Sequence, residues 1–173
     1  TLTTKAEIIA VEYAENLNTF IVAEKDNSIR NYDLSGKLGH EYKIKAKPTF
    51  LKYNHQNKSV AISYGKKIDL VDMQGKNIRA LTPHWKYYDF ITLAWSPSGK
   101  YLAACDNGNI CTVWSVDDGK IIKEWMDQAI AFSFTAKEDG IMCFNGSGDS
   151  NLYNLKTKEP KFYKHEKNGP PKT

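Results

Sequence analysis

The chain has 173 residues, of which 41% are hydrophobic and 12% aromatic, with 24 basic and 20 acidic side chains. This composition excludes wholesale disorder, and the length suits one domain with a real hydrophobic core. No apolar run reaches the roughly 18 residues that span a bilayer, and the N-terminus has no signal-peptide pattern, so we expect no membrane span.

Short apolar runs between turn residues predict four strands in each of four successive segments. No segment keeps a helical period, so the chain is predicted to be all β. In chain order the predicted strands are 8–13, 20–24, 29–32 and about 38–44; 49–53, 59–64, 67–71 and 78–81; 91–95, 101–105, 110–114 and 121–125; 129–134, 141–144, 151–153 and 161–163.

The four segments repeat at a nearly constant interval. Each begins with an apolar-x-aromatic triplet, and the aromatics Tyr13, Tyr53, Trp95 and Phe134 lie 40, 42 and 39 residues apart. A period near 40 residues with four strands per repeat is typical of β-propeller blades. We therefore predict a propeller of four-stranded antiparallel blades over residues 1–163, with blades at about 6–44, 48–82, 90–126 and 129–163, followed by a flexible Lys/Pro-rich tail at 164–173.

The third segment carries a family resemblance. Residues 93–103, Leu-Ala-Trp-Ser-Pro-Ser-Gly-Lys-Tyr-Leu-Ala, resemble the V-x-F-S-P-D-G-x-x-L-A segment of WD40 repeats, and residues 109–115 resemble the segment that ends in the Trp-Asp dipeptide. The resemblance extends from residue 8 to about 163 and rests mostly on spacing in the second and fourth segments. It implies a WD40-like β-propeller, a fold that usually serves protein–protein interaction.

The repeats depart from the family pattern. The Gly-His dipeptide is absent from its expected place, and the structural Asp of the family occurs only as Asp26, with Gly108 at the matching position of the third repeat. We therefore expect divergent blades held mainly by apolar packing.

WD40-like rings usually have seven or eight blades, so the four blades are expected to form about half of a larger ring. Further sequence, a second copy or a partner protein would complete it; a closed four-bladed ring is the alternative.

The cysteines indicate the redox state of the compartment in which the protein works, and the distribution of charge indicates whether nucleic acid is a partner. Cys105, Cys111 and Cys143 show no CxxC spacing, and their odd number favours reduced thiols in a cytoplasmic, intracellular protein. Residues 156–173 hold six Lys and two Glu, which leaves 18 basic and 18 acidic residues in the rest of the chain. With only two arginines in the whole chain, a nucleic-acid partner is not favoured. RNA or ribosome association, as in propellers of some translation initiation factors, is kept as the alternative function.

No constellation of residues points to an enzyme, a metal or a cofactor. The four histidines at 40, 55, 84 and 165 are scattered, and none has metal-ligand spacing with Cys or another His. We therefore expect a non-catalytic interaction scaffold, part of a larger assembly with other protein subunits.

One connection is richer in aromatic residues than a linker requires. Residues 83–90, Pro-His-Trp-Lys-Tyr-Tyr-Asp-Phe, link the second blade to the third on the top face, the side that also carries the turns between second and third strands. Trp and Tyr are frequent interface anchors; filling the groove between blades is the alternative role, favoured for Phe90. The predicted partner-binding residues are His84, Trp85, Lys86, Tyr87 and Tyr88, with Tyr64, Lys66, Asp106 and Asn107 from neighbouring turns.

Overall fold

A computed structural model describes residues 3–85, 88–146, 148–157 and 160–163, the last four as backbone only. The strands are β1 (Ile8–Ala14), β2 (Thr19–Glu24), β3 (Ser28–Asp33), β4 (Leu38–Lys43), β5 (Phe50–Asn54), β6 (Ser59–Tyr64), β7 (Lys67–Asp72), β8 (Asn77–Leu81), β9 (Phe90–Trp95), β10 (Tyr101–Asp106), β11 (Ile110–Ser115), β12 (Ile121–Met126), β13 (Ala129–Phe134), β14 (Gly140–Asn145), β15 (Ser150–Asn154) and β16 (Pro160–Tyr163). A 3-10 turn, η1 (Glu15–Leu17), is the one helical element of the described residues.

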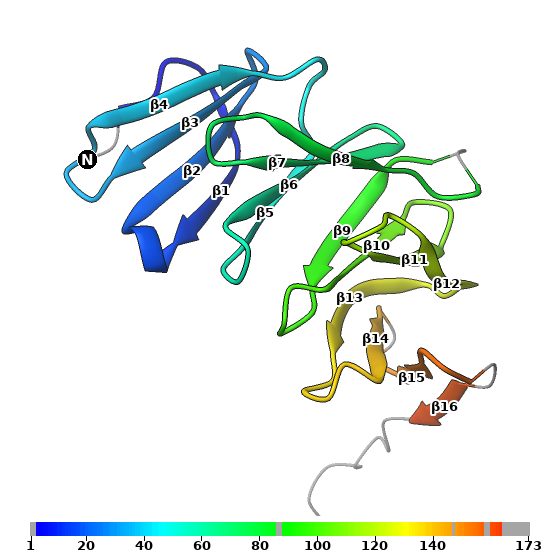
Figure 1. The fold of residues 1–173 in the computed structure, drawn as a ribbon. Helices are drawn as coiled ribbons and strands as arrows, with labels where there is room; N and C mark the ends of the chain where they lie inside the picture. Colours follow the sequence, from blue (N-terminus) through cyan, green and yellow to red (C-terminus); the bar gives the residue numbers. More distant parts are fainter. Residues whose placement is uncertain (1–2, 86–87, 147, 158–159, 164–173) are drawn as a thin grey trace, which may run out of the picture.

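The sixteen strands form four antiparallel sheets, β1–β4, β5–β8, β9–β12 and β13–β16, each with its strands in chain order. We call these sheets blades 1 to 4. The blades follow one another as an open fan (Figure 1), with their first strands β1, β5, β9 and β13 side by side along the inner edge. The predicted all-β propeller fold is confirmed.

Hairpin turns set the register within each blade. The Gly-Lys turns between third and fourth strands place Gly36, Gly75 and Gly119 at φ values of 84°, 82° and 73°. Glycine adopts this left-handed region without steric cost, so these positions allow a tight reversal into the outer strand.

Apolar packing between neighbouring blades holds the fan together. Successive residues of a strand point to opposite faces, so each inner blade contributes to two of these contacts. One buried cluster lies between blades 1 and 2, a second between blades 2 and 3, and a third between blades 3 and 4. Trp114, the aromatic of the Trp-Asp-like segment, is fully buried at the second contact, and its Nε1 donates to the Thr82 carbonyl at 3.3 Å. The first-strand aromatic Trp95 is only half-buried.

The cysteines differ from the sequence-based expectation. Cys105 and Cys111 lie directly opposite each other in the β10–β11 hairpin, with Cα atoms 4.1 Å apart, and form a disulfide bond. The prediction of reduced cysteines is therefore wrong for this pair, because the hairpin register brings both sulfur atoms within bonding reach. Cys143 is a free and buried thiol, and burial raises its pKa to about 12, which leaves it without thiolate reactivity.

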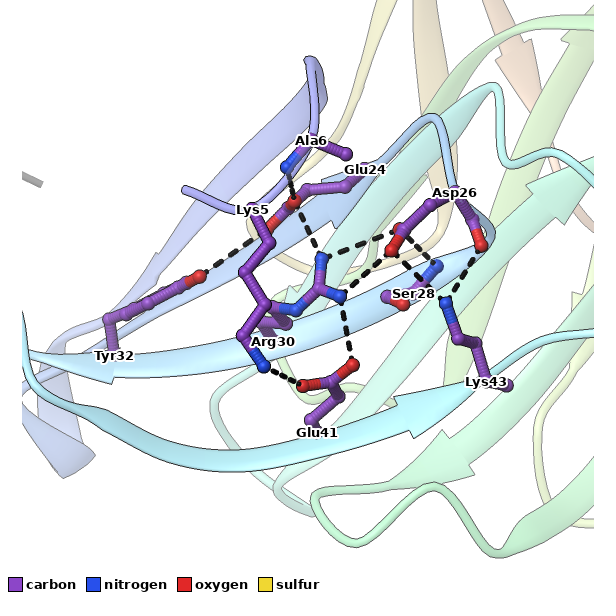
Figure 2. A network of polar contacts seen from close by, with 9 residues as sticks. All are labelled: Lys5, Ala6, Glu24, Asp26, Ser28, Arg30, Tyr32, Glu41 and Lys43. Atoms are coloured by element: carbon purple, nitrogen blue, oxygen red, sulfur yellow. Dashed lines mark hydrogen bonds and ion pairs between the residues drawn. The ribbon is translucent and has the colours of Figure 1, made fainter. Parts of the chain in front are cut away.

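Blade 1 contains a buried ion cluster around Arg30 of β3 (Figure 2). The Arg30 guanidinium lies 2.6 Å from Glu24 Oε2, and both side chains are at most 2% exposed. Arg30 also pairs with Asp26 and with Glu41, each at 2.8 Å. The N-terminal segment covers the cluster, since Lys5 pairs with Glu41 at 2.9 Å and the Ala6 amide donates to Glu24 at 2.6 Å. Asp26, the one residue that matches the structural Asp of the family pattern, thus belongs to a charge cluster, which adds to the apolar packing expected for these blades.

Candidate partner-binding site

The described residues show no arrangement suited to catalysis through a metal. No group of three or more His, Cys, Asp or Glu side chains within that part of the chain is placed to hold an ion. Within the same residues, no helix has the length and apolar character needed to cross a membrane. Exposed side chains gather instead around the connection from β8 to β9, where Trp85 and Tyr88 are 55% and 52% exposed.

The connection from β8 to β9 is fixed at its end by backbone hydrogen bonds to two neighbouring turns. The Phe90 amide donates to the Gly65 carbonyl of blade 2 at 3.4 Å, and the Asn107 amide of blade 3 donates to the Asp89 carbonyl at 2.9 Å. Phe90 itself is buried edge-on against Trp114, with ring centroids 6.0 Å apart. The groove-filling role predicted for Phe90 is confirmed.

His84 ties the beginning of the connection to the outer strand of blade 3. Its Nδ1 lies 3.1 Å from Glu124 Oε2, and its backbone amide donates to Glu124 Oε1 at 3.3 Å. Thr112 Oγ1 donates to the same Oε1 at 3.0 Å. Because the Glu124 side chain is mostly buried while His84 is largely exposed, Glu124 is the anchor and His84 the attached residue.

Tyr88 rests on the turn between β10 and β11. A Cβ atom added to Gly108 would lie 2.1 Å from Tyr88 Cδ2, so the ring occupies space that only glycine leaves open at this position. Tyr88 nevertheless remains 52% exposed. His84 is thus held on Glu124 and Tyr88 on Gly108, one before and one after Trp85 in the sequence.

Trp85 lines an apolar hollow at the top of blade 3. The hollow has a volume of about 370 Å³. Trp85 and Met126 are 55% and 72% exposed, so both side chains are accessible from solvent. This volume is in the range of small-ligand and side-chain pockets. The described residues that line it are Trp85, Ile110, Glu124, Trp125 and Met126.

The structure distributes the predicted residues unevenly. Trp85 lines the hollow. His84 and Tyr88 belong to the same connection but are not among the residues that line the hollow, and Asn107 is exposed on the adjacent turn. Lys86 and Tyr87 lie outside the described residues. Tyr64 and Lys66 belong to the blade 2 turn and are not among the residues that line the hollow.

Asp106 has a structural role in its turn. It is 2% exposed, and its Oδ1 accepts hydrogen bonds from the amides of Gly108 and Ile110, each at 2.9 Å. A buried carboxylate that satisfies two backbone amides stabilises the turn and presents nothing to a partner. Asp106 is therefore left out of the contact surface proposed below.

Sequence reasoning missed four of the residues that line the hollow. Trp125 and Met126 end the outer strand of blade 3, Glu124 precedes them, and Ile110 begins the neighbouring strand β11. The Trp-Met pair at a strand end, next to the inter-blade connection, is the signal that could have found them. An exposed Met beside two Trp residues is typical of adaptable binding surfaces.

Comparison with known proteins identifies the fold. The sequence matches no protein-family model and no curated protein. The structure is similar to the crystal structure of the C-terminal WD40 domain of Sif2, with a TM-score of 0.75 and 16% sequence identity. The match covers 90% of this chain and 48% of that domain, so the chain spans about half the length of the solved relative. The chain thus has the WD40 β-propeller fold, of which it forms four blades.

Proposed function

We propose that the chain is a non-catalytic protein-interaction scaffold that binds a partner protein through the hollow around Trp85. The observation that carries the proposal is the apolar surface of the hollow, where Trp85 and Met126 are exposed and Ile110 is partly exposed. Propellers of the WD40 fold generally mediate protein–protein interaction, which supports the same conclusion by analogy.

The chemistry of the hollow indicates what a partner inserts. Two indole rings, a thioether and an aliphatic side chain favour an apolar or aromatic anchor residue. The Glu124 side chain is mostly buried, and its carboxylate oxygens already contact the His84 amide, Thr112 Oγ1 and His84 Nδ1, so it is poorly placed to bind a polar group of the partner. We therefore propose an extended segment of a partner protein with one large apolar side chain seated against Trp85.

Selection from a random peptide-display library on the wild-type chain tests this proposal. Selected peptides should share an apolar or aromatic residue. Their affinity should fall about thirtyfold or more for Trp85→Ala, the loss typical of a hot-spot aromatic. Met126→Ala should weaken binding in the same direction, with the melting temperature unchanged for both variants because the two side chains are exposed.

Ile122→Ala is the matched control. Ile122 is an exposed apolar residue of β12, the strand that also carries Met126, but it does not line the hollow. The Ile122→Ala variant should bind the selected peptides with the affinity of the wild type. Peptides that bind Trp85→Ala as tightly as the wild type would place the contact elsewhere and refute the proposal.

A further inference from the structure

Lysine residues gather on one face of blades 1 and 2. The top face carries the turns between second and third strands and the connections between blades, and the bottom face carries the remaining turns. The top-face turn and connection segments of blades 1 and 2 hold six Lys and two acidic side chains, within residues 24–28, 43–50 and 64–67. Their bottom-face turns hold three Lys and three acidic side chains, within residues 14–19, 33–38, 54–59 and 72–77. The basic excess in the turns of these two blades is therefore on the top face.

The top-face turns of blades 3 and 4 carry the opposite charge. They hold three Asp and neither Lys nor Arg, within residues 105–110, 126–129 and 144–150. A surface whose charge changes sign from one side to the other orients a charged partner. Acidic groups of a partner are therefore favoured over blades 1 and 2.

Half of the six lysines are already neutralised. Three of them form ion pairs with acidic residues of the chain: Lys25 with Glu7, Lys43 with Asp26 (Figure 2), and Lys67 with Asp69. The other three are exposed and form no ion pair with any described residue. We call these three, Lys45, Lys47 and Lys66, the lysine patch.

The lysine patch lies where blade 1 passes into blade 2. Lys66 is at the tip of the two-residue turn between β6 and β7. Thr49 ends the connection that carries Lys45 and Lys47, and its amide donates to the Ser63 carbonyl of β6 at 2.8 Å. The connection and the turn are therefore neighbours on the top face.

The turn that carries Lys66 also contacts the connection that carries Trp85. The Phe90 amide donates to the Gly65 carbonyl at 3.4 Å, and Asp89 Oδ1 lies 3.7 Å from the position of a Cβ atom added to Gly65. Adjacent strands lie about 5 Å apart and packed sheets about 10 Å apart, so the hollow on blade 3 is about 12–17 Å from the turn on blade 2. An extended chain advances about 3.3 Å per residue, so about four to six residues bridge this distance.

We infer that the lysine patch binds acidic side chains of the same partner segment whose apolar residue occupies the hollow. This inference rests on the proposed function of the hollow, and it adds the charge and the spacing of the partner. Three exposed ammonium groups without ion pairs complement two or three carboxylates, about four to six residues from the apolar residue. Exposed Asp89 lies between the two sites, so it disfavours an acidic residue directly beside the apolar one.

The lysine patch suits the carboxylates of a protein better than the phosphates of RNA. Neither arginine of the chain is available for phosphate recognition, because Arg30 is 2% exposed and Arg79 donates to two backbone carbonyls of blade 3. Surfaces that bind single-stranded RNA add exposed aromatic rings on which bases stack. Tyr64, the aromatic residue beside the patch, is partly buried, and Lys67 Nζ covers its ring at 5.6 Å from the centroid.

Binding of library-selected peptides to two triple variants tests the inference. Peptides selected on the wild type should carry Asp or Glu about four to six residues from their apolar residue. Lys45→Gln/Lys47→Gln/Lys66→Gln should weaken their binding about tenfold, because each exposed ion pair contributes a factor of about 1.5 to 5. The same peptides with Asn or Gln in place of the acidic residues should bind this variant and the wild type equally.

The matched control is Lys37→Gln/Lys58→Gln/Lys76→Gln, which removes three exposed lysines from the bottom face of the same two blades. It changes the net charge by the same amount, and it should bind the selected peptides within about twofold of the wild type. Both triple variants should keep the melting temperature of the wild type, because all six side chains are exposed. Raising the NaCl concentration from 50 to 500 mM should weaken the wild-type complex and leave that of the patch variant nearly unchanged.

The outcomes separate this inference from the proposed function. If the peptides bind Trp85→Ala weakly but lack acidic residues, or lose less than about threefold in the patch variant, the inference fails and the proposed function stands. Equal losses in the two triple variants would likewise overturn the inference. Peptides that depend on the lysine patch but not on Trp85 would overturn both. A uridine oligonucleotide that binds the patch more tightly than the acidic peptides would assign it to nucleic acid and overturn the inference.

Discussion

Replacing Arg30 by methionine should destabilise blade 1 strongly, since it leaves Glu24 buried without its counter-ion. Arg30 and Glu24 are at most 2% exposed and 2.6 Å apart. Removing one partner of a buried pair typically costs about 3–5 kcal/mol, and a chain of this length loses about 2–4 °C of melting temperature per kcal/mol. We therefore expect Arg30→Met to lower the melting temperature by about 6–20 °C.

The double variant Glu24→Gln/Arg30→Met separates loss of charge pairing from loss of packing. Glutamine carries no charge, and its single oxygen can still accept the bond that the Ala6 amide donates to Glu24 Oε2 at 2.6 Å, while its amide group can donate to Tyr32 Oη, which lies 3.4 Å from Glu24 Oε1. Neutralising the orphaned carboxylate should recover about 1–3 kcal/mol relative to the sum of the single losses. Urea unfolding followed by circular dichroism measures these free energies. A loss below about 1 kcal/mol for Arg30→Met, or strict additivity in the double variant, would refute the reasoning.

Three further predictions concern packing, pH and nucleic acid. Trp114→Ala should lower the free energy of unfolding by about 3–5 kcal/mol in thermal melts, because Trp114 is fully buried. Trp95→Ala should lower it less, because Trp95 is half-buried. A larger loss for Trp95→Ala would show that the blade contacts are misassigned. Hydrogen bonding to Arg30 holds the pKa of Glu41 at about 2, against an ordinary 4.5, so its stabilising effect is complete above pH 4.5 and lost as pH falls toward 2. Glu41→Gln should reduce the loss of unfolding free energy that occurs between pH 4.5 and pH 2. An unchanged pH dependence in this variant would contradict the pairing of Glu41 with Arg30. RNA binding measured at two salt concentrations should be negligible at both, whereas a steep salt dependence would favour the translation-factor alternative.

The blades could be predicted from sequence because their signals are local. Alternation and turn glycines such as Gly75 and Gly119 specify each hairpin, and the interval between the first-strand aromatics specifies the repeat. The blade contact that buries Trp114 follows from the same pattern. Local sequence patterns that recur in each of the four blades are therefore sufficient to predict the fold.

The candidate site could be predicted only in part, because it is formed by residues distant in sequence. Trp85 was found through the aromatic excess of its own connection, whereas Met126 joins it only because the register of blade 3 brings the end of β12 beside that connection. The burial of Asp106 and the Cys105–Cys111 disulfide likewise depend on the register of one hairpin. A shift of one residue would move every side chain of a strand to the other face, and strand bounds predicted from sequence are less exact than one residue.

The most direct test of the proposed partner surface is a chemical-shift map of the chain with a peptide selected on the wild type. The amide resonances that shift should cluster in the connection before β9, in the turn before Ile110 and at the end of β12 around Met126. Shifts confined to blades 1 and 4, or to the central strands, would contradict the assignment of partner binding to the hollow around Trp85.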